Sequence, residues 1–467
     1  MIPMPYETFL GQKSQHGEQH GFAPLLVPDV LFDFQQTLLT WAIQKGRAAI
    51  FADCGLGKTP IALAWASNVV QHTGKRVLIL TPLAVGPQFV EEGQKFALPC
   101  TQVRNGHLIG DICVTNYEQL HHLSPHDFAG VVADESSAIK HFEGERRKQV
   151  TEFLRTIPYR LLSTATAAPN DYTELGTSSE AVGELGYHDM LSRFFTTKNR
   201  TISAIRKQWR VNKAPQEEDK GWRFKGHADV PFWQWVSSWA RACRKPSDLG
   251  GNDTAFVLPP LHEVLHVVKA RQKADGMLLE LPAVGLHEER EELKRTLQER
   301  CEQVAALTQD SKPWVCWCNL NPEADLLERL IPDAKQVSGT QSAEEKEAIF
   351  HAFRRGNLRV LITKPKIGAW GLNWTHCHQM TFFASHSYEQ YYQAQRRCWR
   401  FGQQHPVTVH LITTEGQANV LANVQRKAQQ ADAMFTALLT HMRQGQTIAR
   451  TSHGATTITP PSWLKGI

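Results

Sequence analysis

The chain has 467 residues, 42% of them hydrophobic and 21% charged, with a formal net charge of +5. This length allows two or three domains, and the composition is that of an ordinary soluble globular protein. No stretch reaches the ~20 apolar residues of a membrane span, so a membrane partner is not expected. The mild positive charge permits a nucleic-acid partner without demanding one. The nine cysteines are dispersed, with no CxxC pair and no export signal, and this favours a reducing cytosol.

The first segment with recognisable chemistry is ADCGLGKT, residues 52–59. It lies between a short apolar run, predicted to be a buried strand, and a helical pattern that begins near Pro60. Glycines in such a turn let backbone N–H groups surround phosphate oxygens without a Cβ clash. The lysine would reach the β- and γ-phosphates of a nucleotide, and the threonine hydroxyl would ligate Mg²⁺. The alternative is a helix-capping turn that carries a lysine by chance. The residues concerned are Gly55, Gly57, Lys58 and Thr59.

Short apolar runs then recur at residues 76–81, 111–115, 130–135 and 160–164, with polar or amphipathic segments between several of them. Buried strands that alternate with helices predict an α/β domain with a parallel sheet. Open sheets of this kind bind ligands at the carboxyl ends of their strands.

Asp134 and Glu135 are the last two residues of the third of these segments and follow directly on its apolar part. An acid at this position can hold Mg²⁺ through water, and its neighbour can orient the attacking water. The alternative is an acidic N-cap at a strand-to-helix turn. Together with a phosphate loop in the same domain, the pair predicts the second half of a nucleotide site.

These segments resemble the motifs of helicase and translocase ATPases of superfamily two. ADCGLGKT resembles motif I, DESS resembles motif II, and STATAAPN at residues 163–170 resembles motif III, which couples the nucleotide site to nucleic acid. The resemblance also implies that Gln35, in FDFQQ, lies on the adenine side of the site. Two further segments, 80–89 and 114–120, resemble motifs that touch the nucleic-acid backbone, which nominates Thr81, Pro82, Thr115 and Tyr117.

A motor of this superfamily needs a second lobe that completes the site with arginines, and residues 393–403, QAQRRCWRFGQ, fit its pattern. The spacings of four and three predict that Gln393, Arg397 and Arg400 share one helix face. Guanidinium groups bind phosphate oxygens bidentately and act as arginine fingers when they are brought across a cleft. The resemblance places Gln393 at the nucleotide as well. The alternative is a solvated basic helix.

The ending RFGQ and the segment KIGAWGLNW, residues 366–374, resemble the Swi/Snf branch, and within it compact DEAD/DEAH-type helicases of bacteriophages and prophages. This resemblance covers about residues 28–415, and it implies that Lys366 contacts nucleic acid. Motif II departs from the pattern because Ser136-Ser137 replace a pair that ends in histidine, which puts the strength of coupling to nucleic acid in doubt. Further departures are Ala167 in motif III and Ala369, Trp370 and Trp374 in motif V.

Residues 187–256 fit neither lobe and are rich in basic residues and tryptophan. Basic side chains can neutralise phosphates, and aromatic rings can stack on exposed bases. The tryptophans of PFWQWVSSWARAC instead follow a helical stripe, which favours packing. The nucleic-acid candidates in this insertion are Arg206, Lys207 and Arg210.

The sequence therefore predicts an α/β protein of two RecA-like lobes with a helical insertion between them. The function implied by the resemblance is an ATP- and Mg²⁺-dependent DNA translocase on double-stranded DNA, active as a monomer in the bacterial cytoplasm, with phage or host replication or recombination proteins as partners. The alternatives are a strand-separating helicase, a nucleotide-switched DNA-binding module and a metabolic P-loop enzyme. The predicted divisions are an N-terminal extension (1–27), lobe one (28–186), a basic, Trp-rich insertion (187–256), a helical linker (257–310), lobe two (311–415), and a bracing helix with a mobile tail (416–467).

Overall fold

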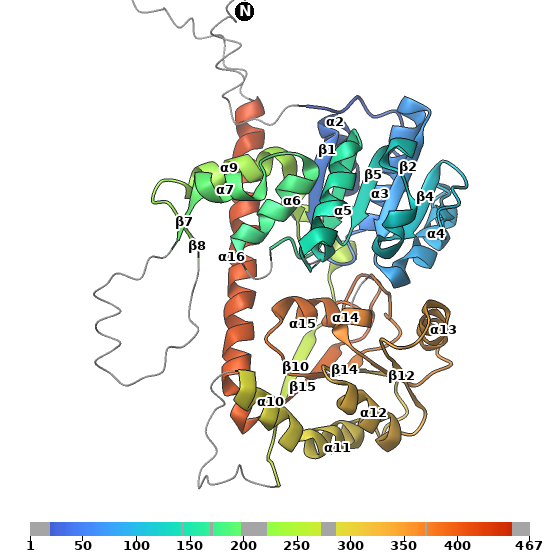
Figure 1. Cartoon of the computed structure of the whole chain (residues 1–467), viewed down its shortest axis with the longest axis vertical. Coiled ribbons are helices and arrows are strands. Elements are labelled where there is room, and N and C mark those ends of the chain that lie inside the picture. The colour runs from blue at the N-terminus through green and yellow to red at the C-terminus, as the bar shows by residue number, and fades with distance from the viewer. Residues whose placement is uncertain are drawn as a thin grey trace, which may run out of the picture.

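The structure is a computed structural model, and it describes residues 19–141, 144–168, 171–197, 222–271, 286–368 and 371–450. It contains two α/β units, which we call lobe one and lobe two, with one long helix running along both (Figure 1). The predicted fold class is confirmed.

Lobe one is built on a seven-stranded parallel sheet in the order β3-β4-β2-β5-β6-β1-β9. Its strands are short runs of β-branched and small apolar residues, as expected of strands that are buried on both faces. The bounds are β1 (Arg47–Ala52), β2 (Arg76–Thr81), β3 (Thr101–Gln102), β4 (Ile112–Asn116), β5 (Phe128–Asp134), β6 (Tyr159–Thr164) and β9 (Ala240–Cys243).

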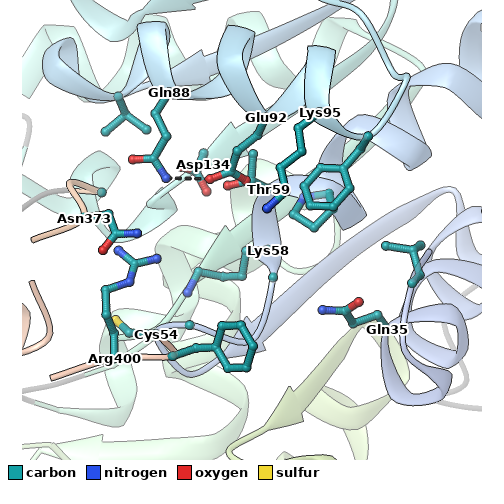
Figure 2. Close-up of a pocket in the computed structure, with 18 of the residues that line it drawn as sticks. Gln35, Cys54, Lys58, Thr59, Gln88, Glu92, Lys95, Asp134, Asn373 and Arg400 are labelled. Atoms are coloured by element: carbon teal, nitrogen blue, oxygen red, sulfur yellow. Dashed lines mark hydrogen bonds between the residues drawn. The ribbon is translucent and has the colours of Figure 1, made fainter. Parts of the chain in front are cut away.

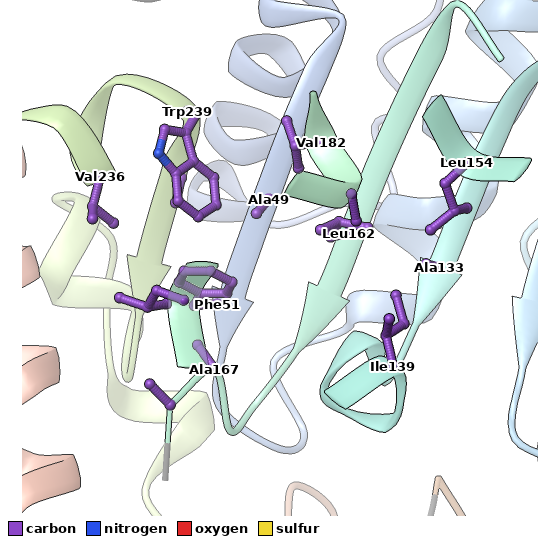
Figure 3. Close-up of a cluster of buried hydrophobic side chains, with 14 of the residues drawn as sticks. Ala49, Phe51, Ala133, Ile139, Leu154, Leu162, Ala167, Val182, Val236 and Trp239 are labelled. Atoms are coloured by element: carbon purple, nitrogen blue, oxygen red, sulfur yellow. The ribbon is translucent and has the colours of Figure 1, made fainter. Parts of the chain in front are cut away.

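Helices cover both faces of this sheet because successive side chains of each strand point to opposite sides. In β1, Ala49 and Phe51 join one hydrophobic cluster, whereas Ala48 and Ile50 join the other. Figure 3 shows Phe51 and Ala49 beside Leu162 of β6 and Trp239 of α9. The first face packs on α5 (Gly144–Thr156), α6 (Leu175–Val182), α7 (Tyr187–Phe194) and α9 (Asp229–Trp239), and the second on α2 (Asp33–Lys45), α3 (Lys58–Thr73) and α4 (Gly86–Lys95).

The segment predicted as a separate insertion belongs in part to lobe one. Strand β9 pairs with β1 and extends the first sheet, so residues 222–243 belong to lobe one. The side chains of Trp233, Trp235 and Trp239 are buried in its core, which confirms that they pack and makes them unavailable to nucleic-acid bases. A two-stranded antiparallel ribbon, β7 (Phe195–Thr197) and β8 (Trp222–Phe224), lies beside this core.

Lobe two is built on a six-stranded parallel sheet in the order β10-β15-β14-β11-β13-β12. Residues 257–310 were predicted to form a helical linker, but β10 forms an edge strand of this sheet along its full length, beside β15. The strands are β10 (Leu261–Val268), β11 (Trp314–Trp317), β12 (Ala334–Val337), β13 (Val360–Thr363), β14 (Gln379–Phe383) and β15 (Val407–Thr414). The helices are α10 (Leu286–Arg295), α11 (Leu297–Leu307), α12 (Asn321–Leu330), α13 (Ala343–Arg354), α14 (Pro365–Gly368) and α15 (Tyr388–Gln395).

Helix α16 (Ala418–Arg450) leaves lobe two and packs on α9 and β9 of lobe one (Figure 1). Its apolar stripe enters the lobe-one cluster that contains the tryptophans of α9. The last helix therefore ties the two lobes together through buried contacts, as its predicted bracing role requires. The buried residues of this stripe are Met434, Phe435, Leu438 and Met442.

Candidate nucleotide site between the lobes

The predicted motifs of lobe one meet at one edge of the first sheet. Strands β1, β6 and β5 are neighbours and parallel, so their carboxyl ends lie side by side. The phosphate loop follows β1, the acidic pair ends β5, and motif III follows β6. A parallel sheet thus brings together segments that lie far apart in the sequence.

The phosphate loop has the backbone that its glycines predict. Gly55 and Gly57 have φ of +85° and +76°, in the left-handed region that favours glycine. A Cβ on Gly57 would lie 2.2 Å from Nε2 of Gln35 and would have to displace that side chain. Helix α3 begins directly at Lys58, whose Nζ donates to the carbonyl oxygens of Ala52 (3.0 Å) and Asp53 (3.2 Å). The lysine therefore lies along the loop that would hold the phosphates.

The acidic pair is buried at the bottom of the same cleft. Burial, together with the adjacent Glu135, raises the pKa of Asp134 to about 7, while Lys58 acts to lower it. Glu135 has a φ of +47°, an uncommon conformation for a residue other than glycine. Thr164 donates a long hydrogen bond (3.4 Å) to the Glu135 carboxylate. Two carboxyl groups held together out of water form a site that a cation would stabilise.

A cavity of about 260 Å³ joins these groups to lobe two. Figure 2 shows Lys58, Thr59 and Asp134 from lobe one facing Arg400 and Asn373 from lobe two. All the lobe-one residues predicted to bind nucleotide or metal line this cavity: Gln35, Gly55, Gly57, Lys58, Thr59, Asp134 and Glu135. Both predicted fingers, Arg397 and Arg400, line it as well.

The two fingers line the cleft as predicted, but they do not lie on the face of a helix. Helix α15 ends at Gln395, so Arg397 and Arg400 lie in the turns after it and not on its face. The backbone N–H of Arg397 donates to the carbonyl of Ala394, and the side-chain Nε of Arg397 donates to the carbonyl of Gln393 (2.9 Å). The carbonyl of Gln393 thus accepts from a side-chain N–H, where a continuing α-helix would supply the backbone N–H of Arg397.

Motif V of lobe two fixes both fingers. The carbonyl of Leu372 accepts from Nη1 of Arg397 (3.2 Å) and from Nη1 of Arg400 (3.0 Å). Burial and the neighbouring Arg397 lower the pKa of Arg400 to about 10, which still leaves it charged at neutral pH. Within the described part of the chain, the buried Nε of Arg400 has no hydrogen-bond partner. A phosphate oxygen would satisfy that donor.

Gln393 does not line the cavity, which corrects its predicted place at the nucleotide. Its Nε2 donates to Oγ1 of Thr166 (3.0 Å), and its Oε1 accepts from Arg397 (3.1 Å). Ser137 lies within 3.3 Å of Thr164 and 3.4 Å of Thr166, so the serine that replaces the expected histidine contacts motif III. A chain of buried polar groups thus runs from Glu135 through motif III to the finger segment.

Two glycines allow the lobes to approach closely at the cleft. A Cβ on Gly371 of lobe two would lie 2.2 Å from Cγ2 of Val85 in lobe one. A Cβ on Gly55 would lie 2.8 Å from the backbone nitrogen of Phe401. Any larger side chain at either position would force the lobes apart or distort the backbone.

Three of the predicted nucleic-acid contacts are corrected by the structure. The side chains of Thr81, Thr115 and Tyr117 are buried inside lobe one. The Tyr117 hydroxyl donates to the carbonyl of Asp134 (2.8 Å), so this residue supports the acidic pair. Thr115 Oγ1 donates to the carbonyl of Val103 (3.0 Å). These side chains satisfy the backbone of their own sheet and are closed to a ligand.

Of the remaining predicted nucleic-acid contacts, two lie in the described residues and three lie outside them. Pro82 is half-buried at the end of β2, and Lys366 is exposed on α14. Arg206, Lys207 and Arg210 lie outside the described residues, as do Ala369 and Trp370 of motif V. Trp374 is buried in the core of lobe two, so this departure from the motif is absorbed by packing.

Several residues that line the cavity were not predicted from the sequence. Helix α4 contributes Gln88, Glu92 and Lys95, with a hydrogen bond of 2.7 Å between the first two (Figure 2). The spacing of four and three along one amphipathic helix could have suggested a shared face, although not that it faces a nucleotide. Asn373 lies in the recognised motif V. Four exposed or half-exposed aromatic rings also line the cavity: Phe32, Phe96, Phe256 and Phe401.

The residues present fit a nucleoside triphosphate with Mg²⁺. The glycine backbone and Lys58 would hold phosphate oxygens, and Thr59 and Asp134 would hold the metal. The unpartnered donor of Arg400 and the buried acidic pair are the observations that favour this fit. In the described residues, no helix has the length and apolar character that crossing a bilayer requires.

Comparison with known proteins supports the same architecture. Residues 289–402 match the family model of the helicase conserved C-terminal domain. Among solved structures, one that matches is S. cerevisiae Dbp5 bound to RNA and ADP BeF3, with 12% identity and a TM-score of 0.52, covering 88% of this chain and 93% of that chain. A comparison with curated proteins finds no match. The chain therefore has two parallel-sheet α/β lobes that resemble the tandem RecA-like lobes of helicases, and residues 289–402 resemble the helicase conserved C-terminal domain.

Proposed function

We propose that this protein is an ATP-driven nucleic-acid motor of the helicase type, and that its track is duplex DNA. The observation that carries the proposal is the cleft between the lobes. There the phosphate loop and the acidic pair of lobe one meet Arg397 and Arg400 of lobe two around one cavity. Arginines brought from a second lobe across a cleft can act as arginine fingers on the transferred phosphoryl group.

Each group in the cleft has a chemical role that follows from its position. Bound MgATP supplies the phosphoanhydride bond whose hydrolysis drives the cycle. Lys58 and the backbone N–H groups of the loop neutralise the phosphates, and Glu135 orients the attacking water. Arg397 and Arg400 stabilise charge that develops on the transferred phosphoryl group only when the lobes are closed.

The buried polar chain from Glu135 to Gln393 supports coupling between the nucleotide and lobe movement. It passes through Ser137 and Thr166, whose hydroxyl groups can each donate and accept. Loss of the γ-phosphate would change the contacts of Arg397 and Arg400, and the lobes would then shift relative to each other. Repeated closing and opening of two lobes that both grip a backbone produces translocation.

The choice of DNA and of translocation over strand separation rests on the resemblance of motifs V and VI to the Swi/Snf branch. Among the described residues, the tryptophans of α9 are packed inside lobe one and cannot form a wedge. The competing function is a strand-separating helicase, on DNA or on RNA.

Steady-state ATP hydrolysis by the full chain tests the proposal. Turnover should rise when duplex DNA is added and should be abolished in Lys58→Ala, which loses the charge beside the β- and γ-phosphates. Single-stranded DNA, forked DNA, and single- and double-stranded RNA form the other arms of the assay. Turnover that no nucleic acid stimulates would reject the motor, and stimulation by RNA alone would reject DNA as the track.

A second pair of assays separates translocation from unwinding. A triplex-forming third strand ahead of the enzyme should be displaced in the presence of ATP, while a forked duplex should stay paired. Fork unwinding without triplex displacement would make the protein a strand-separating helicase.

A further inference from the structure

A second cavity, of about 190 Å³, lies between lobe one, lobe two and helix α16. Lobe one contributes the start of motif III, lobe two contributes helix α15, and α16 closes the remaining side. Of the described residues, none lines both this cavity and the first one, which we call the nucleotide cavity from here on. A cavity of about 150 Å³ can hold a benzene molecule, so the second cavity has room for a compound with a single ring.

One wall separates the two cavities, and adjacent residues of the same two segments line its opposite sides. In the phosphate loop, Cys54 lines the nucleotide cavity and Asp53 lines the second cavity. In the segment that carries the fingers, Arg397 and Arg400 line the nucleotide cavity and Arg396 lines the second. An ion pair of 2.7 Å joins Asp53 to Arg396. A molecule in the second cavity would therefore contact the back of the wall that carries the phosphate loop and the fingers.

The second cavity is bordered by hydrogen-bond donors, and one of them lacks an acceptor. Arg396 is only 8% exposed, and its buried Nε has no hydrogen-bond partner among the described residues. Tyr388 of α15 also lines the cavity, and burial raises the pKa of its hydroxyl to about 12. This hydroxyl therefore keeps its proton at neutral pH and can donate. A buried donor without an acceptor is costly, and a ligand that brings an acceptor removes that cost.

The charges around the second cavity are balanced within the protein. Asp53 pairs with Arg396, and Arg244 pairs with Asp432 of α16 at 2.7 Å. These are the four charged residues that line the cavity in the described part of the chain. An ionic ligand would bring a charge that finds no free counter-charge there, so a neutral ligand is favoured. Apolar side chains form much of the remaining lining: Ala167, Ala168, Met434 and Phe435.

We infer that the second cavity is a binding site for a small neutral molecule with a flat apolar body and a hydrogen-bond acceptor, such as a carbonyl group. The carbonyl oxygen accepts from Arg396 or from the Tyr388 hydroxyl, and the apolar body packs on Met434 and Phe435 of α16. Because such a ligand contacts both lobes and α16 at once, it stabilises the arrangement in which the three are docked. The site goes beyond the proposed function, which enters only through the link to the nucleotide.

The shared wall links this site to the nucleotide cavity. A ligand that holds Asp53 and Arg396 in place also holds the phosphate loop and the fingers in their arrangement around the nucleotide cavity. The ligand therefore favours nucleotide binding, and by thermodynamic linkage the nucleotide favours the ligand by the same factor. The ligand also opposes reopening of the lobes. It thus lowers turnover without competing with the nucleotide.

Binding of benzamide to the full chain, measured by calorimetry and by ligand-observed NMR, tests the site. Benzamide has one ring and one amide carbonyl, and its dissociation constant should be about millimolar, as expected for so few atoms. Ala431→Phe should fill the cavity and weaken benzamide binding at least about tenfold. Ala433→Phe is the matched control, because Ala433 is exposed on the same helix and does not line the cavity. Unchanged benzamide affinity in a folded Ala431→Phe protein would overturn the inference.

A second variant and a second probe test the chemical class of the ligand. Arg396→Lys keeps a cation beside Asp53 but has no Nε, so it should weaken benzamide binding at least about threefold. Benzoate has the same size and carries a charge, so it should bind more weakly than benzamide. Benzoate that binds more tightly than benzamide, or benzamide binding that is unchanged in Arg396→Lys, would overturn the assignment of a neutral acceptor.

The link to the nucleotide is measured with MgADP and without turnover. Saturating MgADP should raise the affinity for benzamide about twofold or more, and benzamide should raise the affinity for ADP by the same factor. Displacement of benzamide by MgADP would place the probe in the nucleotide cavity and overturn the inference. A protein that binds benzamide as described but does not bind ADP would fail as an ATP-driven motor and keep the second site. ADP binding without benzamide binding would remove the second site and leave the motor untouched.

Discussion

The guanidinium of Arg396 in lobe two lies 2.7 Å from the carboxylate of Asp53 in the phosphate loop. The other oxygen of Asp53 accepts from the hydroxyl of Tyr392 and from the backbone N–H of Cys54. The Arg396 guanidinium also lies over the ring of Trp399. Burial acts to lower the pKa of Arg396, but Tyr392 and Asp53 outweigh it and raise that pKa above its ordinary value. The segment that carries the fingers is therefore attached to the phosphate loop at a residue that does not line the nucleotide cavity.

Breaking this ion pair should impair catalysis through the position of the fingers. Arg396→Met and Asp53→Asn should each lower ATP turnover, and the double variant should lose much less than the sum of the two effects. Contacting residues in one network show coupling energies of about 0.5–3 kcal/mol. Steady-state kinetics of the four proteins gives the coupling energy. Arg355→Met, at an exposed arginine of lobe two, is the control. Strictly additive effects would show that the pair does not link the lobes in the working enzyme.

Arg400→Ala should separate binding from chemistry. The variant should bind ADP nearly as well as the wild type, because the phosphate loop is intact, yet lose turnover by about 10³-fold or more, the usual contribution of an arginine finger. Calorimetry gives the affinity, and a phosphate-release assay gives the rate. If affinity fell as steeply as turnover, Arg400 would be a ground-state ligand.

Gly371→Ala should hinder closure of the lobes. The added Cβ would lie 2.2 Å from Val85, and the φ of +68° adds strain of about 1–3 kcal/mol for a residue other than glycine. Turnover should fall, and Val85→Ala in the same chain should recover part of it by removing the methyl group in the way. A single variant with unchanged turnover would mean that the two lobes do not approach this closely during the cycle.

Leu438→Ala should destabilise lobe one although the residue belongs to the last helix. Leu438 is fully buried in the lobe-one core, and removal of such a side chain costs about 2–5 kcal/mol. Denaturant unfolding monitored by tryptophan fluorescence reports this loss, because α9 carries three of the tryptophans in that core. Thr436→Ala, on the exposed face of the same helix, should have little effect. Equal stability of the two variants would show that α16 is not docked on lobe one in solution.

The basic stretch of the insertion lies outside the described residues, so its role is tested by salt dependence. Replacement of Arg206, Lys207 and Arg210 by alanine should weaken DNA binding and lower the slope of log affinity against log salt by about 0.9 for each lost phosphate contact. Fluorescence anisotropy at four salt concentrations measures that slope. A slope equal to that of the wild type, in a folded protein, would assign these side chains to a solvated surface.

The sequence by itself determined the local chemistry of the site. A strand followed by glycines, a lysine and a helix specifies a phosphate loop, because φ angles, helix starts and backbone N–H directions depend on neighbouring residues. The acidic pair at the end of β5 was equally predictable, since carboxylates directly after a buried apolar run lie at the carboxyl end of a strand, where open parallel sheets bind ligands. The helical stripe of the α9 tryptophans correctly indicated packing, because burial follows from periodicity along a single element.

Only the tertiary structure decided which segments meet. Nothing in the local pattern shows that β9 extends the first sheet or that β10 forms an edge of the second, because strand pairing joins residues far apart in the chain. The same limit applies to Tyr117, which resembles a nucleic-acid contact but donates to the carbonyl of Asp134. It applies to Gln393 as well, which contacts Thr166 in place of the nucleotide. A motif fixes which groups are available, and the partners that satisfy their hydrogen bonds are fixed only when distant segments pack.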